Sequence, residues 1–251
     1  MKKEKNEQIS TARVLGGREL QEDRLIVRKN SKGILMAVAD GHNGPWTADY
    51  VITNFAKKFL GSLPSCSDAG EAFRKVFAEL AVETREHDSG TTLSCVYIHK
   101  AFKRAYVATI GDSPIIICSP GGFIYTSPDH NVRTNLEERE RCIARRGWYQ
   151  NGYIMSNTVR DVGLQMARAL GDSEMGDVIE RVPEISFVDL QSGSVVVVAS
   201  DGVFDPRHLS ANQGICRIAG RVLEGATAKN IVDESPGKKY DNATAIVWRM
   251  G

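Results

Sequence analysis

Short apolar runs, each about as long as a single β-strand, recur along this 251-residue chain and restrict the folds open to it. A turn sequence, Ser119–Gly122, separates two of the runs, so they are predicted to pair as an antiparallel hairpin. No run approaches the roughly 20 apolar residues that cross a bilayer. The predicted strands are Leu25–Val27, Ile34–Ala39, Thr92–Ile98, Ala105–Thr109, Ile115–Cys118, Phe123–Tyr125, Val195–Ala199 and Ala245–Trp248.

Two segments between the strands have the periodicity of amphipathic helices. Apolar residues recur on one face of Trp46–Leu60 and of Ala69–Glu83, and Ser67 or Asp68 is expected to cap the second helix. The chain has no internal repeat and no Gly/Pro-rich linker. The mixed order of strands and helices predicts one α+β domain rather than regular βαβ units. Weaker helical patterns cover Leu136–Arg146 and Ile215–Leu223.

Composition and charge argue against several classes of protein. Hydrophobic residues make up 42% of the chain and charged residues 25%, so it can bury a core. The 32 basic and 31 acidic residues give a net charge of +1, and we expect neither a nucleic-acid nor a membrane partner. The polar start Met1–Gln8 lacks a signal-peptide core, which predicts a cytoplasmic location. Five scattered cysteines without a Cys-x-x-Cys pair argue against a disulfide framework, a zinc ribbon or a catalytic thiolate.

Acidic residues stand where the apolar runs begin or end. Asp40 and Asp201 each follow a run and precede a glycine, which permits a tight turn or a close approach of two backbones. Asp112 follows a third run, and Glu22 and Asp241 stand shortly before two others. A single Asp-Gly pair is most often a turn signal. Several carboxylates that converged would repel one another unless a cation lay between them, and such hard oxygen ligands suit Mg²⁺ or Mn²⁺. The sequence alone leaves their convergence open.

These acids belong to an ordered set of short motifs that spans residues 18 to 242. The set resembles the metal-dependent serine/threonine protein phosphatase family, type 2C class. The resemblance implies a four-layer αββα sandwich, two antiparallel sheets flanked by helices, as a single phosphatase catalytic domain over residues 1–251. The motifs are Arg18–Arg24, Val38–Gly44, Ser89–Thr92, Ile110–Ser113, Asp129-His130, Ala167–Asp172, Ala199–Gly202 and Asp241-Asn242.

The resemblance also implies a metal centre with two Mg²⁺ or Mn²⁺ ions. By position, Asp40 would bridge the two ions, and Glu22 and the backbone carbonyl of Gly41 would hold one of them. Asp201 and Asp241 would hold the other ion. Two further acids have implied roles in the same centre: Asp112 matches a position linked to a weaker third ion, and Asp23 would orient water held by the metals.

The implied reaction is hydrolysis of phosphoserine and phosphothreonine in proteins by water that the metals make more acidic. Arg18 would grip the phosphate oxygens as a planar two-point donor. His42 would be the general acid that protonates the leaving alkoxide. The expected partner is therefore a phosphorylated protein, and we expect the enzyme to be a monomer.

Other positions are left with two interpretations. Arg168 either neighbours the site or forms a buried ion pair, and His130 is expected to be structural. The segment at about residues 147–162 lies where the family has a variable flap, and its aromatic side chains either contact a substrate or pack beneath the loop. Three positions depart from the family pattern, which affects third-metal affinity and substrate preference rather than the primary ligands: Gln21, Pro114 and Ala167.

Two alternatives to a protein phosphatase also follow from the sequence. One is a catalytically silent phosphatase-like module that binds a partner, although such modules typically lose one or more of the metal acids that are all present here. The other is a phosphatase of small phosphoesters, which the same metals would serve.

Overall fold

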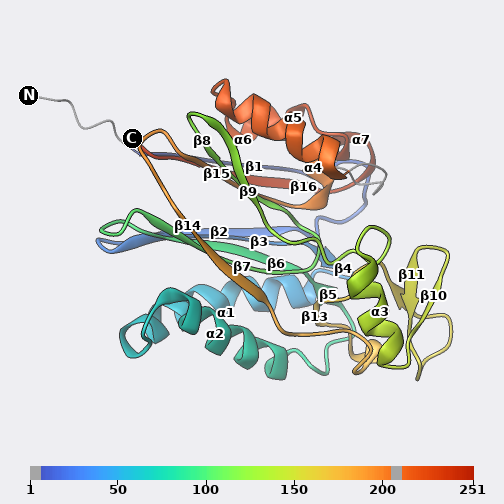
Figure 1. The fold of residues 1–251 in the computed structure, drawn as a ribbon. Coiled ribbons are helices and arrows are strands. Elements are labelled where there is room, and N and C mark those ends of the chain that lie inside the picture. Colours follow the sequence, from blue (N-terminus) through green and yellow to red (C-terminus); the bar gives the residue numbers. More distant parts are fainter. Residues whose placement is uncertain (1–6, 205–210) are drawn as a thin grey trace, which may run out of the picture.

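The computed structural model describes residues 7–204 and 211–251, and it consists mainly of two five-stranded antiparallel sheets packed face to face. Figure 1 shows helices covering the outer face of each sheet. The predicted α+β class and αββα layering are thus confirmed. In spatial order, the first sheet contains β1 (Gln8–Val14), β16 (Ala243–Arg249), β15 (Val195–Ala199), β8 (Ile115–Ser119) and β9 (Gly122–Thr126). The second contains β14 (Glu184–Asp189), β7 (Arg104–Ile110), β6 (Leu93–His99), β3 (Gly33–Ala39) and β2 (Arg24–Lys29).

Different helices cover the two sheets. Helices α1 (Trp46–Ser62) and α2 (Ala69–Glu83) pack on the second sheet, with the short 3₁₀ helix η1 (Leu63–Ser65) between them. Helices α5 (Ala211–Leu223) and α6 (Ala228–Asp233) pack on the first sheet. The remaining helices are α3 (Leu136–Ala144), α4 (Asp201–Phe204), α7 (Gly237–Tyr240) and the 3₁₀ helix η2 (Ser173–Met175).

Two small sheets lie at one end of the sandwich, together with α3 (Figure 1). One small sheet contains β13 (Leu170–Gly171), β5 (Gly90–Thr91) and β4 (Gly41–His42). The other contains β10 (Trp148–Gln150), β11 (Tyr153–Met155) and β12 (Gly163–Leu164). These elements extend the sandwich at the end where the acidic motifs lie.

Strand β3 shows how one apolar run supports two layers of the core. Successive side chains of a strand point to opposite faces, so a run that is apolar at every position must be covered on both sides. Ile34, Met36 and Val38 pack between the two sheets. Leu35 and Ala37 pack against α1 and α2 on the other face. Each fully buried large apolar side chain contributes about 1.5–3 kcal/mol, which makes these layers the main source of stability.

The predicted helices and the hairpin are all present. Asp68 caps α2, because its side chain accepts a hydrogen bond from the backbone N–H of Glu71 at 2.8 Å. The β8–β9 hairpin turns at the predicted Ser119–Gly122 segment. The weaker patterns correspond to α3, which ends at Ala144, and to α5, which begins at Ala211. None of the described helices has the length and apolar character needed to span a membrane.

Strands β1 and β14 were not among the predicted strands. Both are edge strands, and neither contains a fully buried side chain. An edge strand covered on one side carries polar residues at alternate positions, so it lacks the continuous apolar run by which the inner strands are recognised.

Candidate active site

One cavity of about 250 Å³ at this end of the sandwich is lined by all eight residues to which metal-binding or catalytic roles were assigned from the sequence. These residues are Arg18, Glu22, Asp40, Gly41, His42, Asp112, Asp201 and Asp241. Their convergence, which the sequence alone left open, is therefore present in the structure.

Strand direction explains why the acids meet. Strands β3 and β7 both run antiparallel to β6, so they end on the same side, and Asp40 and Asp112 follow those ends. Strand β15 runs antiparallel to β16, so the end of β15 lies beside the start of β16. Asp201 follows β15 and Asp241 stands two residues before β16, which brings them together from the opposite sheet.

The glycines that follow Asp40 and Asp201 permit close backbone approaches, as predicted. A Cβ atom on Gly202 would lie 1.9 Å from the backbone oxygen of Asn242. A Cβ atom on Gly41 would lie 2.7 Å from the backbone oxygen of Glu22. Both distances are too short for any side chain, so the Asp-Gly pairs pack the acidic loops against one another at the cavity.

Like charges crowd the cavity. Burial raises the pKa of Asp40 well above its ordinary value, and the nearby carboxylates of Asp23, Asp201 and Asp112 raise it further. Burial, with a contribution from Asp201, raises the pKa of Asp23 to about 6. Asp241 also has a raised pKa, caused by burial and by Asp201 and partly offset by Arg18. Anionic side chains are thus held together at an electrostatic cost.

The donor set fits Mg²⁺ or Mn²⁺. The cavity offers carboxylate oxygens and a backbone carbonyl oxygen, which hard divalent cations prefer, and a cation there would relieve the repulsion that raises these pKa values. Within residues 7–204 and 211–251, no three His, Cys, Asp or Glu side chains are close enough to enclose a single ion. The acids therefore line a shared cavity rather than a closed cage.

Arg18 makes a two-point contact with Asp241. Its Nε lies 2.8 Å from Asp241 Oδ1, and its Nη2 donates to Asp241 Oδ2 at 3.0 Å. Arg18 remains half exposed at the cavity mouth, with 52% of its side chain accessible. The same planar fork that binds this carboxylate matches the oxygens of a phosphate group.

His42 pairs with a residue to which sequence reasoning gave no role. His42 Nε2 lies 2.8 Å from Oδ1 and 2.9 Å from Oδ2 of the buried Asp172. Burial lowers the pKa of His42, but the charge and hydrogen bond of Asp172 outweigh it and raise the pKa overall. A Cβ atom on Gly90 would lie 2.0 Å from Asp172 Oδ2 and 2.2 Å from His42 Nε2, so Gly90 makes room for the pair.

Asp172 is itself held firmly. It has a left-handed backbone with a φ of 54°, directly after Gly171 at 83°. Arg181 Nη2 donates to the backbone oxygens of Gly171 at 2.8 Å and Asp172 at 3.2 Å. Asp172 ends the Ala167–Asp172 motif, so the sequence signal was present, but only the tertiary structure shows that it faces His42.

Tyr153 and residues 163–166 form another wall of the cavity. Gln165 Nε2 donates to the Tyr153 hydroxyl at 3.0 Å. Tyr153 is 40% exposed and Trp148 is 46% exposed, so these aromatic side chains face solvent rather than packing beneath the loop. Tyr153 also lines the cavity, whereas Trp148 does not.

Two of the departures from the family pattern contact the site. The Gln21 side chain accepts a hydrogen bond from the backbone N–H of Asp23 at 3.0 Å and donates to the backbone oxygen of Val14 at 3.0 Å. It therefore fixes the loop that carries Glu22. Pro114 lines an adjoining, mainly apolar cavity of about 350 Å³ that also contacts Asp112 and Asp201.

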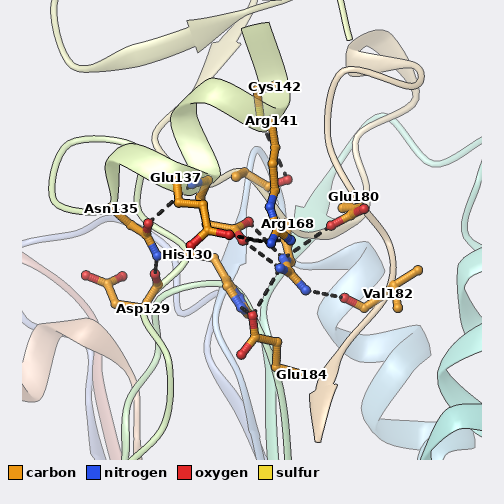
Figure 2. A network of polar contacts seen from close by, with 12 residues as sticks. Asp129, His130, Asn135, Glu137, Arg141, Cys142, Arg168, Glu180, Val182 and Glu184 are labelled. Carbon is orange, nitrogen blue, oxygen red and sulfur yellow. Dashed lines mark hydrogen bonds and ion pairs between the residues drawn. The ribbon is translucent and has the colours of Figure 1, made fainter. Parts of the chain in front are cut away.

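Arg168 does not line the acidic cavity and forms a buried ion pair instead. Its Nε and Nη2 donate to the two carboxylate oxygens of Glu138 at 2.8 and 2.5 Å (Figure 2). Glu184 accepts a further hydrogen bond from Arg168 Nη2 at 3.1 Å. His130 is fully buried beside this cluster, which agrees with the structural role expected for it.

Comparisons with known proteins define the class. The sequence profile of the family described as Protein phosphatase 2C matches residues 4–235. "Probable protein phosphatase 2C 12" of Arabidopsis thaliana is 30% identical, over 96% of this chain and 63% of its own length. A serine-threonine phosphatase 2C structure from Toxoplasma gondii has a TM-score of 0.74 at 17% identity, covering 97% of this chain and 94% of that one.

A second solved structure carries metal ions. It is the catalytic domain of the serine threonine protein phosphatase PstP, in complex with two manganese ions. It has a TM-score of 0.58 at 21% identity and covers 97% of both chains, a likeness that concerns the fold.

The fold is that of a phosphatase-type α+β sandwich. The chain belongs to the protein phosphatase 2C family. It spans between about half and two thirds of the length of the curated relatives it matches.

Proposed function

We propose that this chain is a Mg²⁺- or Mn²⁺-dependent phosphatase that hydrolyses phosphoserine and phosphothreonine in proteins. The observation that carries the proposal is the cavity in which Arg18 and His42 stand among five carboxylates, two of which, Asp40 and Asp241, have pKa values raised by burial and by neighbouring acids. Membership of the protein phosphatase 2C family supports the same reaction.

The carboxylates would hold the metal ions. Glu22, Asp40 and the Gly41 carbonyl would hold one ion and Asp201 and Asp241 the other, with Asp40 shared. Asp112 would hold a weaker third ion. When bound, these ions would lower the pKa of water and offset the negative charge of the phosphoryl group.

Arg18 would orient the phosphate. A phosphate monoester is anionic, so it needs a cationic donor at the mouth of an otherwise acidic cavity. Arg18 is half exposed there, and its Nε and Nη2 atoms already bind two oxygens of Asp241 in the geometry suited to two phosphate oxygens. We propose that the guanidinium turns from Asp241 to the substrate when metal ions compete for that carboxylate.

His42 would protonate the leaving group. A serine or threonine alkoxide leaves poorly, and a general acid typically contributes about 10²–10⁴-fold to such a step. Nε2 of His42 donates to Asp172, so Nδ1 is the atom that remains to give a proton to the alkoxide oxygen. Asp172 keeps the imidazole oriented and favours its protonated form.

The wall formed by Tyr153 and residues 163–166 would contact the polypeptide around the phosphorylated residue. We propose that residues 147–162 act as the flap of a single catalytic domain. Trp148 and Tyr153 are exposed, and Tyr153 borders the cavity, so they are available to an extended substrate chain. The net charge of +1 suits recognition of one phosphate at a time rather than of a polyanion.

The decisive experiment is a phosphopeptide assay with Mn²⁺ and then with EDTA. We expect release of inorganic phosphate from phosphoserine and phosphothreonine peptides with Mn²⁺ and its loss with EDTA. Activity that persists in EDTA would contradict the metal mechanism. A silent partner-binding module would release no phosphate under either condition, and a phosphatase of small phosphoesters would prefer a small ester such as a sugar phosphate to the peptides.

A further inference from the structure

The Gly111–Asp112 turn carries one of the cavity acids. It is bound by the loop that follows β9, which contains His130 and Asn131. Gly111 has a φ of 102°, and its backbone N–H donates to Nδ1 of His130 at 3.0 Å. In return, the backbone N–H of His130 donates to the Gly111 oxygen at 3.3 Å. The two residues thus form a reciprocal pair across a separation of 19 positions.

Asn131, the next residue, holds the acid itself. Its Nδ2 donates to Asp112 Oδ2 at 2.9 Å. Its Oδ1 accepts a hydrogen bond from the backbone N–H of Arg133 at 3.0 Å, which fixes the orientation of the amide. Asn131 is 1% exposed, so water does not compete for this contact. We call His130 and Asn131 together the clamp.

The clamp is supported from the side away from the cavity. His130 Nε2 lies 3.8 Å from Glu184 Oε1, and Glu184 accepts from Arg168, which is bound by Glu138 (Figure 2). The backbone oxygen of His130 accepts from the N–H of Ala167 at 2.8 Å, directly before Arg168. The imidazole is therefore confined between the Gly111 turn and the ion-pair cluster.

The hydrogen bonds define the chemical state of the imidazole. Gly111 N–H donates to Nδ1, so Nδ1 must be an unprotonated acceptor and the proton of neutral His130 stands on Nε2, toward Glu184. His130 consequently acts as an acceptor that fixes a backbone turn. It is not among the residues that line the cavity.

We propose that His130 and Asn131 are positioning residues that hold the Asp112 carboxylate toward the cavity, and that their loss weakens the binding of the divalent cation that Asp112 contacts. The inference deepens the proposed function and rests on it. Partners that orient a metal ligand typically contribute about 10–100-fold to metal affinity, and the clamp restricts both the backbone and the carboxylate of this ligand.

The test uses substitutions that remove different parts of the clamp from the full chain. His130→Ala removes the acceptor for Gly111, whereas His130→Asn retains an oxygen where Nδ1 stands. Asn131→Ala leaves the acceptor for Gly111 in place and removes the side-chain contacts of Asn131, namely the donor to Asp112 and the acceptor for the Arg133 backbone N–H. Asp112→Asn is the reference for losing the ligand, and His99→Ala is the matched control, since His99 lies at the end of β6 and does not line the cavity.

Two measurements besides activity are made on each variant. Amide hydrogen exchange of Gly111 in metal-free protein should be slow in the wild type and in His130→Asn, and fast in His130→Ala. In a calorimetric Mn²⁺ titration, the weakest binding step should become about tenfold weaker in His130→Ala and Asn131→Ala. That step should be unchanged in His130→Asn and His99→Ala. If His130→Ala does not fold, Asn131→Ala and His130→Asn still give the comparison.

The outcomes separate this inference from the proposed function. Wild-type Mn²⁺ affinity in Asn131→Ala, together with a weakened step in Asp112→Asn, would overturn the positioning role and leave the phosphatase proposal standing. Absence of Mn²⁺ binding by the wild type, despite a protected Gly111 amide, would overturn both. Weakening in both clamp variants, with recovery in His130→Asn, would establish the role.

Discussion

The protein contains two clusters of buried charge at the same end of the sandwich, and their electrostatics are opposite. In the cluster around Arg168, the guanidinium contacts Glu138 and Glu184, and the pKa values of both glutamates are lowered. Burial tends to raise the pKa of Glu138, but Arg168 outweighs it. In the cavity, the pKa values of Asp40 and Asp241 are raised.

The difference separates a structural cluster from a functional one. A buried cluster that pairs opposite charges lowers the pKa of its carboxylates and holds elements together, here α3 and β14. A cluster that gathers like charges is held at a cost by the surrounding fold, and such perturbed carboxylates concentrate where proteins bind cations or perform catalysis. This contrast supports placing the active site in the cavity.

The largest effect is expected for Asp201→Asn. Removal of a metal-binding carboxylate should lower kcat/KM on a phosphopeptide by about a thousandfold or more, since metal ions supply several kcal/mol of transition-state stabilisation. The same change removes a repelling charge, so the metal-free variant should unfold at a temperature no lower than the wild type. Calorimetric unfolding and a phosphate-release assay check both halves, and near-normal turnover would refute the assigned metal site.

Arg168→Met should have the largest effect on stability. It leaves the buried Glu138 without the two hydrogen bonds from Arg168, which typically costs about 3–5 kcal/mol. The exposed pair of Lys229 with Asp233 provides the control, because Lys229→Met should leave stability close to that of the wild type. Urea unfolding of both variants measures the difference. Equal stabilities would show that the Arg168 cluster is not the structural element described above.

The two clusters also predict opposite dependences of stability on pH. Glu138 and Glu184 have lowered pKa values, so their ionised forms stabilise the fold at pH values above 4.5, the ordinary pKa of glutamate. This stabilisation is lost as the pH falls below 4.5 and through the lowered pKa values of the folded protein. Raised pKa values act in the other direction. The stabilising contribution of Asp23 is lost as the pH rises from its ordinary pKa of 3.8 to about 6, and that of Asp40 is lost as the pH rises through its own raised pKa.

The stability of the metal-free protein should therefore be highest near pH 4.5 and should decline as the pH rises toward 6. Saturating Mn²⁺ should remove this decline, because a bound cation relieves the repulsion in the cavity. Thermal unfolding across pH, with and without Mn²⁺, provides the measurement. A metal-free protein whose stability keeps rising from pH 4.5 to pH 6 would contradict this interpretation of the cavity.

The smallest effect is expected for Asp172→Asn. Burial lowers the pKa of His42, but the charge and hydrogen bond of Asp172 raise it overall. An uncharged asparagine at position 172 should therefore lower the pKa of His42. A general acid must be protonated, so activity is lost as the pH rises through its pKa. In Asp172→Asn this loss of activity should occur at lower pH than in the wild type, and kcat should be about tenfold lower near neutral pH. Asp88→Asn is the control, since Asp88 binds Ser173 rather than His42. An unshifted pH profile would exclude the assigned pair.

The sequence predicted the inner strands and the acids at their ends for one physical reason. Runs such as Ile34–Ala39 are buried on both faces and therefore apolar throughout, and a carboxylate directly after such a run must lie at the edge of the core. The direction of the strands then brings Asp40 and Asp201 to one cavity.

Contacts between distant segments could not be predicted in the same way. His42 and Asp172 are 130 positions apart, and their pairing depends on the small sheet of β4, β5 and β13. The choice between two roles for Arg168 depended on Glu138, which α3 places beside it. Neither pairing leaves a periodic pattern in the sequence.

The central claim is that the cavity carboxylates are an unbalanced set that divalent cations neutralise. It is tested most directly by titrating the metal-free wild type with Mn²⁺ at pH 6, in two buffers of different ionisation enthalpy. We predict saturable binding with release of protons, because a cation displaces protons from carboxylates whose pKa values are raised. Absence of binding, or binding without proton release, would contradict the account.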